Sequence, residues 1–253
     1  MADSSRPDLP DGTADVWWAH KLDASDRFAG LLDDTERQRL ARYRSEEDQQ
    51  RFLTGCVLAK TVLARYTGQP AAGIHFDRTC AQCGRPHGKP VLAGDGWARD
   101  GWAHSVSHSG DLVAVAVARN PVGVDVEQLD SRRRAGAAAD PEALAKMVLS
   151  GPEQAALAAI VPSSRARQFL VAWTRKEAVT KATGDGLSVA FSDVVVAADH
   201  GPPRVLSWPY PRDPAQVSLR DLDTEPGYVA ALAVIGRCET VRPQDGSALL
   251  AAA

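Results

Sequence analysis

Apolar residues recur along this chain with two spacings, one typical of helices and one typical of strands. Helical spacing predicts two helices in the first half of the chain, at residues 33–47 and 48–66, and two in the second half, at 141–149 and 165–182. Short or alternating apolar runs bounded by Gly and Pro predict strands at residues 73–76, 90–92, 104–106, 112–118, 122–127, 189–197, 204–208, 216–222 and 228–235.

In each half of the chain the predicted helices come before the predicted strands. This order favours an α+β fold over a parallel sheet. The turn sequence at residues 119–121 joins the apolar runs 112–118 and 122–127, which we expect to form a hairpin. We predict four parts: a flexible leader (1–15), an N-terminal α+β half (16–119), a C-terminal α+β half (120–241) and a flexible tail (242–253).

The composition is that of an ordinary globular protein. Hydrophobic residues make up 44% of the 253 residues and charged residues 24%, which argues against a disordered or fibrous chain. A net charge of −3 argues against nucleic acid as the main partner. No apolar run approaches the roughly 20 residues that a membrane helix needs, and the first 20 residues do not resemble a signal peptide. We therefore expect a cytoplasmic protein that binds neither nucleic acid nor membrane.

Three carboxylates from two distant segments are candidates for a metal site. Helical spacing places Trp173, Glu177 and Lys181 in one row, each four residues from the next. Strand periodicity points Asp125 and Glu127 to one face of their strand. Mg²⁺ prefers oxygen ligands and usually leaves room for water and phosphate. The acids therefore predict a Mg²⁺ site for a phosphate-containing substrate, with Mn²⁺ as an alternative ion, although each charge alone is more often a solvated surface residue.

A second candidate group precedes the apolar run at 112–118. Ser105, Ser107, His108 and Gly110 offer hydroxyl groups, an imidazole and a flexible backbone close together in the sequence. These groups suit the oxygens of a phosphate, because hydroxyl and imidazole groups can donate hydrogen bonds. The bland alternative is that His108 simply caps the predicted hairpin.

Four motifs in this order and spacing resemble the 4'-phosphopantetheinyl transferase superfamily, in particular its long, surfactin synthetase-activating type. A weaker fifth match is the helical segment Arg51-Phe-Leu-Thr-Gly55, and the resemblance spans roughly residues 33–235. The four motifs are Gly88-Lys89-Pro90, Ser107-His108-Ser109, Gly123-Val-Asp125-Val-Glu127, and the helix from Trp173 to Lys181 followed by Gly184-Asp185-Gly186-Leu187.

The resemblance implies a Mg²⁺-dependent enzyme that transfers the 4'-phosphopantetheine group of coenzyme A. The acceptor is a serine of an apo acyl or peptidyl carrier protein, and the leaving group is adenosine 3',5'-bisphosphate. It also implies two similar α+β halves in a pseudo-twofold arrangement, with the active site between them. Because both halves occur in one chain, we expect a monomer. The long type suggests carriers of polyketide or nonribosomal peptide biosynthesis, but the sequence does not identify the carrier.

The resemblance also assigns roles to individual residues. Asp125, Glu127 and Glu177 would bind the metal, and Glu177 would be the catalytic base, acting directly or through a metal-bound water. Lys181 would lie near the diphosphate as a catalytic and coenzyme-binding residue. Apart from the resemblance, we expect Trp173 to be structural, with its indole packed in the core. The remaining coenzyme A-binding residues would be Arg39, Arg51, Lys89, Pro90, Ser107 and His108, while Glu36 departs from relatives that carry Lys there.

Three other interpretations stay open at this point. Cys80, Cys83, His87 and His75 could supply four tetrahedral zinc ligands, or the Cys80 segment could simply be a tight loop before Gly88. A zinc-knuckle nucleic-acid binder would need a basic stripe with interleaved aromatic residues, which this segment lacks. The chain could also be a transferase for another diphosphate, or a non-catalytic carrier-binding module, although none of the predicted acids is lost.

Overall fold

The computed structural model describes residues 7–22, 26–80, 83–86, 88–94, 101–129, 141–198, 201–209 and 213–253. The chain forms two units. The first comprises Met1–Pro121 together with Cys238–Ala253, and the second comprises Val122–Arg237. Helices and largely antiparallel sheets occur in both units, so the fold is α+β, as the sequence predicts.

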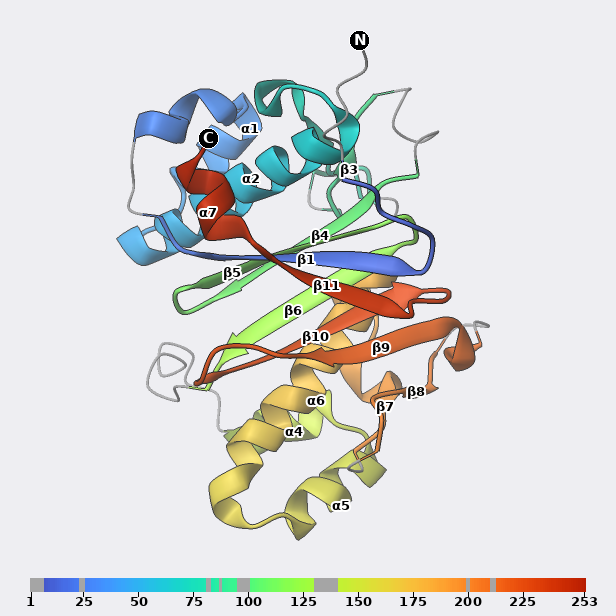
Figure 1. Cartoon of the computed structure of the whole chain (residues 1–253). Helices are drawn as coiled ribbons and strands as arrows, with labels where there is room; N and C mark the ends of the chain where they lie inside the picture. Colours follow the sequence, from blue (N-terminus) through green and yellow to red (C-terminus); the bar gives the residue numbers. More distant parts are fainter. Residues whose placement is uncertain are drawn as a thin grey trace. The chain divides into compact units, whose positions relative to one another are not determined.

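The first unit contains a four-stranded sheet built from both ends of the chain (Figure 1). Its strands are β1 (Thr13–His20), β4 (Ala103–Ser109), β5 (Leu112–Ala118) and β11 (Thr240–Asp245), in the order β11-β1-β5-β4. β11 is parallel to β1, whereas the β1–β5 and β4–β5 pairs are antiparallel. The last segment of the chain therefore completes the sheet that its first strand begins.

A 22-residue helix, α2 (Glu46–Thr67), packs against one face of this sheet and forms the core of the first unit. The core includes Val57, Val62, Leu63, Val113, Val115 and Val117, all of them fully buried. The other elements of the unit are the 3-10 helices η1 (Asp26–Leu31) and η2 (Ala71–Gly73), the helices α1 (Asp34–Leu40) and α7 (Gly246–Ala251), and the short strands β2 (Phe76–Asp77) and β3 (Val91–Leu92).

The second unit packs another 22-residue helix, α6 (Pro162–Thr183), against an antiparallel sheet. The sheet has the order β6-β10-β9, with β6 at Val122–Gln128, β10 at Tyr228–Ile235 and β9 at Val217–Leu222. The remaining elements are α4 (Pro141–Val148), α5 (Gly151–Ala159), η4 (Gly186–Ser188), η5 (Phe191–Asp193), η6 (Pro214–Gln216) and the strands β7 (Val195–Val196) and β8 (Val205–Ser207).

The ends of the long helices follow from local residue chemistry. Ser45 caps α2 by accepting a hydrogen bond from the backbone N–H of Asp48. Both long helices end at a glycine in the left-handed conformation, Gly68 with φ 73° and Gly184 with φ 81°. Ser150 precedes α5 in a capping box, in which its backbone N–H donates to the Glu153 carboxylate at 2.7 Å. Within the described part of the chain, no helix has the length and apolar content needed to cross a bilayer.

The predicted hairpin between residues 112–118 and 122–127 is wrong. β5 pairs with β1 and β4, while β6 pairs with β10 in the other sheet. The hairpin of this region is instead β4–β5, and Gly110 at its turn has a positive φ of 58°. The turn at 119–121 therefore leads from one unit to the next. The local sequence did not predict this, because strand partners are set by contacts with residues far away in the chain.

The predicted flexible tail at 242–253 is also wrong, because this segment contributes to β11 and forms α7. Arg242 donates hydrogen bonds of 2.6 and 2.9 Å to the two carboxylate oxygens of Asp15 on β1, and Leu250 is buried. Pro243 is tolerated because β11 is an edge strand. The leader is shorter than predicted, since Leu9 is buried and β1 begins at Thr13, while residues 1–6 lie outside the described residues.

A buried lysine holds four elements of the second unit together. The Lys176 side chain on α6 is fully buried, and its ammonium donates to the carbonyls of Val148 and Phe191 at 2.9 Å. It also donates to the Glu153 carboxylate at 2.6 Å. The second Glu153 oxygen accepts the backbone N–H of Val196. All three ammonium donors are therefore used, which is the condition under which a charge can be buried.

We expect Arg242→Met to lower the free energy of unfolding by about 2–3 kcal/mol, because it leaves the buried Asp15 carboxylate without its cation. Urea denaturation of the full chain measures the change. Arg44→Met, at an exposed arginine, is the matched control and should change stability by less than about 0.5 kcal/mol. Equal stabilities of the two variants would contradict the anchoring role of Arg242.

We expect Lys176→Met to cost about 3–5 kcal/mol of stability, because removal of one partner leaves the Glu153 charge buried and uncompensated. The measurement is again urea denaturation. Lys146→Met on α4 is the control, since Lys146 is exposed and its replacement should be nearly neutral. A cost below 1 kcal/mol for Lys176→Met would show that this polar cluster does not hold the unit together.

Candidate functional site

The backbone of α6 lies directly on β6 at Gly123. A Cβ atom at this position would lie 2.0 Å from the carbonyl oxygen of Ala178 and 2.4 Å from the backbone nitrogen of Ala182. Only glycine permits such a close approach. Because side chains two residues apart share a strand face, Asp125 and Glu127 lie on the face of β6 that α6 covers.

Asp125 and Lys181 form an ion pair on this face. The Lys181 ammonium donates to Asp125 Oδ1 at 2.7 Å and to the Val124 carbonyl at 3.2 Å. The Asp125 side chain is only 6% exposed and that of Lys181 is 27% exposed, so solvent screens the pair weakly. The lysine that spacing predicts to lie beside the acids is thus held directly by one of them.

Glu177 lies one helical turn before Lys181 and is half-buried. Burial raises the pKa of Glu177 to about 6; the Lys181 ammonium opposes this rise, while the Asp125 and Glu127 carboxylates add to it. The three carboxylates therefore lie within electrostatic range of one another. A carboxyl with a pKa near neutrality also suits a general base.

The donor chemistry of this acid cluster, which comprises Asp125, Glu127 and Glu177, fits a hard divalent cation, since all three groups are carboxylates. Among the residues that the structure describes, however, no three His, Cys, Asp or Glu side chains are close enough together to hold a metal ion. The Asp125 carboxylate is engaged by Lys181 instead. The Mg²⁺ site stays a prediction.

Two of the predicted coenzyme-binding residues come together in the first unit. Arg51 on α2 donates to the Gly110 carbonyl at 3.0 Å and to Asp48 at 2.5 Å. The Arg51 hydrogen bond is the main cause of the lowered pKa of Asp48, and His108 contributes a smaller effect, which places the imidazole in the same neighbourhood. His108 also lies near Gly55 on α2, where a Cβ would be 3.9 Å from its ring.

Ser107 and His108 do not lie on the same face of their strand. Adjacent residues of a strand point to opposite faces, and His108 is exposed whereas Ser107 is buried. The cross-strand partner of His108 is Val113, which belongs to the core beneath α2, while that of Ser107 is Ala114. The two residues of this motif therefore cannot reach one ligand atom from the same side of the sheet.

The Gly88-Lys89-Pro90 motif lies against the β2–β3 hairpin. The Gly88 N–H donates to the Arg78 carbonyl at 2.7 Å, and a Cβ at Gly88 would lie 2.8 Å from the Thr79 carbonyl oxygen. Lys89 and Pro90 are half-buried, and burial lowers the pKa of Lys89 to about 8. The motif therefore presents a lysine whose charge is only partly solvated.

Arg78 is a basic residue of this region that the sequence analysis did not single out. It lies within electrostatic range of Arg39, which is half-buried in the last turn of α1. Arg78 and Lys89 also both act on His104, whose pKa falls to about 3 mainly because of burial. The available signal was its position ten residues before Gly88, between the predicted strands at 73–76 and 90–92.

Trp173 has aromatic partners on both sides, as expected for a structural residue. Its ring lies 5.4 Å from that of Phe191 and 6.3 Å from that of Phe169, measured between centroids. Tilted aromatic pairs at these separations are favourable. The indole thus helps to fix the helix that carries Glu177 and Lys181.

The possible zinc ligands receive no support as a four-residue site. Cys80 is half-buried and Cys83 is exposed, and the Gly84 N–H donates to the Cys80 carbonyl at 2.8 Å. His75 lies with its Nδ1 atom 4.0 Å from the Asp33 carboxylate. His87 lies outside the described residues. Zinc binding therefore stays an untested alternative.

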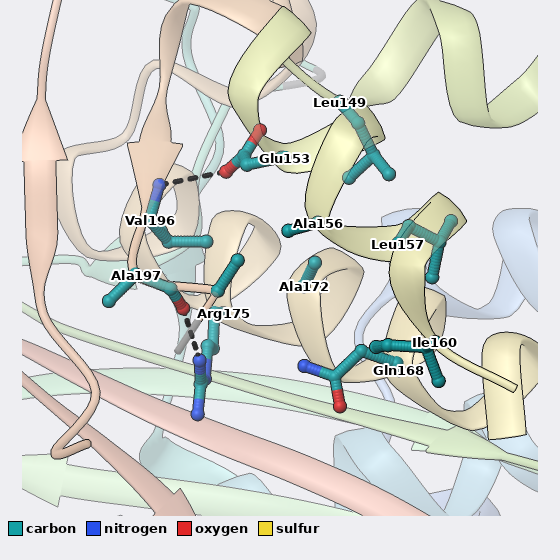
Figure 2. A pocket seen from close by; sticks show the side chains of 11 residues that line it. Leu149, Glu153, Ala156, Leu157, Ile160, Gln168, Ala172, Arg175, Val196 and Ala197 are labelled. Carbon is teal, nitrogen blue, oxygen red and sulfur yellow. Dashed lines mark hydrogen bonds between the residues drawn. The ribbon is translucent and has the colours of Figure 1, made fainter. Parts of the chain in front are cut away.

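A separate pocket in the second unit lies between α5, α6 and β7 (Figure 2). Its walls are mostly apolar, including Leu157 and Ile160. Two of its polar side chains already have partners: Glu153 accepts the Val196 N–H, and Arg175 donates to the Ala197 carbonyl and to Asp221. None of the residues of the acid cluster lines it, so we assign no chemistry to this pocket.

Two family models agree with the motifs. Residues 121–233 match a family model described as the 4'-phosphopantetheinyl transferase superfamily, and residues 17–120 match one described as the N-terminal part of a 4'-phosphopantetheinyl transferase. A holo-[acyl-carrier-protein] synthase structure from Thermotoga maritima aligns with a TM-score of 0.35 at 24% identity, covering 46% of this chain and 63% of that chain.

Curated relatives match over most of the chain. The 4'-phosphopantetheinyl transferase HetI from Nostoc sp. is 31% identical over 83% of this chain and 81% of its own length. The 4'-phosphopantetheinyl transferase Sfp from Bacillus subtilis is 26% identical over 82% of this chain and 84% of its own. The chain therefore belongs to the 4'-phosphopantetheinyl transferase superfamily and is an enzyme of that class.

Proposed function

We propose that this enzyme transfers the 4'-phosphopantetheine group of coenzyme A to a serine of an apo carrier protein and releases adenosine 3',5'-bisphosphate. The observation that carries the proposal is the convergence of Asp125, Glu127, Glu177 and Lys181 on one face of β6. Family membership supplies the reaction class, and this cluster supplies groups with the chemistry that the reaction needs.

Glu177 accepts the proton of the incoming serine hydroxyl. Its carboxyl pKa of about 6 leaves it largely ionised at neutral pH and still basic enough to take a proton. The neighbouring Lys181 ammonium stabilises the negative charge that develops on the leaving diphosphate oxygen. Asp125 orients that ammonium through the 2.7 Å ion pair.

Asp125, Glu127 and Glu177 are the residues that would hold Mg²⁺. When bound, the ion neutralises charge on the diphosphate of coenzyme A. The three carboxylates outnumber the one ammonium among them, so the cluster carries the surplus negative charge that attracts a divalent cation.

The first unit supplies the basic groups for the phosphates of coenzyme A. Arg51 and His108 form one group, while Arg39 lies near Arg78 and Lys89 near His104. Ser107 and Pro90 belong to the same two motifs. Both units occur in one chain, which supports action as a monomer, with the carrier protein and coenzyme A as partners.

The test uses the purified chain with Mg²⁺, coenzyme A and apo carriers of the fatty-acid, polyketide and nonribosomal-peptide classes. Intact mass of the carrier should rise by one phosphopantetheine group, and adenosine 3',5'-bisphosphate should appear in the filtrate.

We expect chelator, Asp125→Ala and Glu177→Ala to abolish transfer. Lys181→Ala should lower kcat by about 10²–10⁴-fold with a smaller effect on KM, since its role is greatest in the transition state.

Asp223→Ala provides the matched control, because Asp223 is an exposed acid of the same unit and should leave turnover unchanged. If no carrier gains mass, the proposal that a carrier-protein serine is the acceptor is contradicted. Near-normal turnover of the three cluster variants would instead show that the reaction takes place elsewhere on the protein.

The raised pKa of Glu177 predicts the pH dependence of stability in chelator. The folded state favours the protonated carboxyl, so this contribution is fully present below the ordinary value of 4.5 and is lost as pH rises through about 6. Relative to Glu177→Gln, the wild type should lose about 2 kcal/mol of unfolding free energy between pH 4.5 and 7.5. Urea denaturation measures the difference; a constant or rising difference would contradict the buried, acid-crowded site.

A further inference from the structure

Two accessible thiols lie in the segment that connects β2 to β3. Cys83 is exposed and Cys80 is half-buried, whereas the other two cysteines of the chain, Cys56 and Cys238, are 7% and 3% exposed. A reagent in solution therefore reaches the thiols of the connecting segment and is kept from those of the core. The proposed transfer reaction uses neither of the two accessible thiols.

Backbone hydrogen bonds place both cysteines in one turn. The Gly84 N–H donates to the Cys80 carbonyl, and the Cys80 N–H donates to the Arg85 carbonyl, both at 2.8 Å. The first of these bonds closes a single turn over residues 80–84, and Gly84 has the positive φ of 70° on which the turn ends. Cys80 and Cys83 are three residues apart in this turn, a spacing at which side chains are neighbours.

The described residues supply this pair with no further metal ligands. His75 lies before β2, and its carbonyl accepts the Ala93 N–H at the end of the β2–β3 ladder that is away from the turn. Within the described ranges, no three His, Cys, Asp or Glu side chains are grouped closely enough to hold a metal ion. The chemistry available to two neighbouring thiols by themselves is disulfide formation.

The sequence around the turn is positively charged. Residues 78–92 contain Arg78, Arg85 and Lys89 but neither Asp nor Glu. Arg85 is exposed, as is Cys83. Local positive charge raises the concentration of anions near a surface, and both glutathione disulfide and coenzyme A disulfide are anions. The exposed thiol is therefore placed where an anionic oxidant of this class collects.

The turn is also tied to the Gly88-Lys89-Pro90 motif. The Gly88 N–H donates to the Arg78 carbonyl at 2.7 Å, and a Cβ atom at Gly88 would lie 2.8 Å from the carbonyl oxygen of Thr79, the residue before Cys80. A disulfide needs Cβ atoms about 3.5–4.5 Å apart, which is closer than the about 5–6 Å between neighbours on a helical turn. Closing the disulfide therefore displaces backbone against which Gly88 is packed.

We propose that Cys80 and Cys83 form a reversible disulfide by exchange with an anionic low-mass disulfide, and that this disulfide weakens coenzyme A binding by the Gly88-Lys89-Pro90 motif. The effect on binding rests on the proposed function. First the Cys83 thiolate attacks the reagent, forms a mixed disulfide and releases one thiolate. The Cys80 thiolate then attacks the Cys83 sulfur and releases the second. Two protein thiols are oxidised, the reagent is reduced to two thiols, and the two protein protons pass to the released thiolates.

The first measurement incubates the reduced full chain with glutathione disulfide or coenzyme A disulfide and follows intact and peptide masses. The wild type should lose two hydrogen atoms, with the disulfide mapped to Cys80 and Cys83, and dithiothreitol should reverse the change. Cys80→Ser should stop at a mixed disulfide on Cys83. Cys56→Ala, at a buried thiol, is the matched control and should react as the wild type. The faster reagent identifies which source of the disulfide the turn favours.

The second measurement is isothermal titration calorimetry of coenzyme A in Mg²⁺, with the reduced and the oxidised wild type after the reagent has been removed. Oxidation should weaken coenzyme A binding about fivefold or more, as expected for two coupled sites. The double variant Cys80→Ser, Cys83→Ser should bind coenzyme A as the reduced wild type does, before and after the same treatment. This comparison separates the disulfide from any other effect of the reagent.

Each other result has a distinct meaning. If neither reagent produces the Cys80–Cys83 disulfide, the proposal is overturned. A stable one-to-one complex with Zn²⁺ that blocks both thiols also overturns it, because the turn is then a metal site. A disulfide that leaves coenzyme A affinity unchanged overturns the link to binding. A reduced wild type that does not bind coenzyme A would instead remove the proposed function and leave the exchange result standing.

Discussion

The acid cluster depends on the close contact between α6 and β6 at Gly123. A side chain there would meet the backbone of α6 at 2.0 Å, so any larger residue would push the helix off the strand. The helix carries Glu177 and Lys181 and the strand carries Asp125 and Glu127, which means that the distance between the two elements sets the distance between the groups. One missing Cβ atom thus controls the geometry of the whole cluster.

Buried ammonium groups fix the elements next to the candidate binding residues. Lys176 immediately precedes Glu177 and binds three oxygens from α4, α5 and η5. In the first unit, Lys60 holds Glu36 of α1 and the Leu31 carbonyl. A buried ion pair gains little stability over an apolar substitute, but its donors specify positions that an apolar contact would leave adjustable. The two lysines therefore define where neighbouring functional groups lie.

Local periodicity predicted much of the fold and most of the acid cluster. It could not predict which strands pair or which side chains are buried. Spacing alone put Glu177 and Lys181 on one helix face and Asp125 and Glu127 on one strand face, because these patterns involve a single element. The pairing of β5, and the folding of residues 240–251 into a strand and a helix, depend on contacts with distant segments. β11, for example, pairs with β1, which lies more than 200 residues earlier in the chain. The burial of Arg78 beside the Glu36–Lys60 pair depends on contacts between separate elements, so its place in the sequence did not show it.

The two units carry candidate groups of opposite charge. The second unit gathers three carboxylates around one ammonium, and the elevated pKa of Glu177 reflects the burial and the like charges of that cluster. In the first unit Arg39 lies within electrostatic range of Arg78, and Arg78 lies 3.8 Å from the Glu36 carboxylate, which Lys60 already pairs. A cation and the phosphates of a nucleotide need surroundings of opposite sign. Each surplus is built from residues of one unit, where a ligand of opposite charge can offset it.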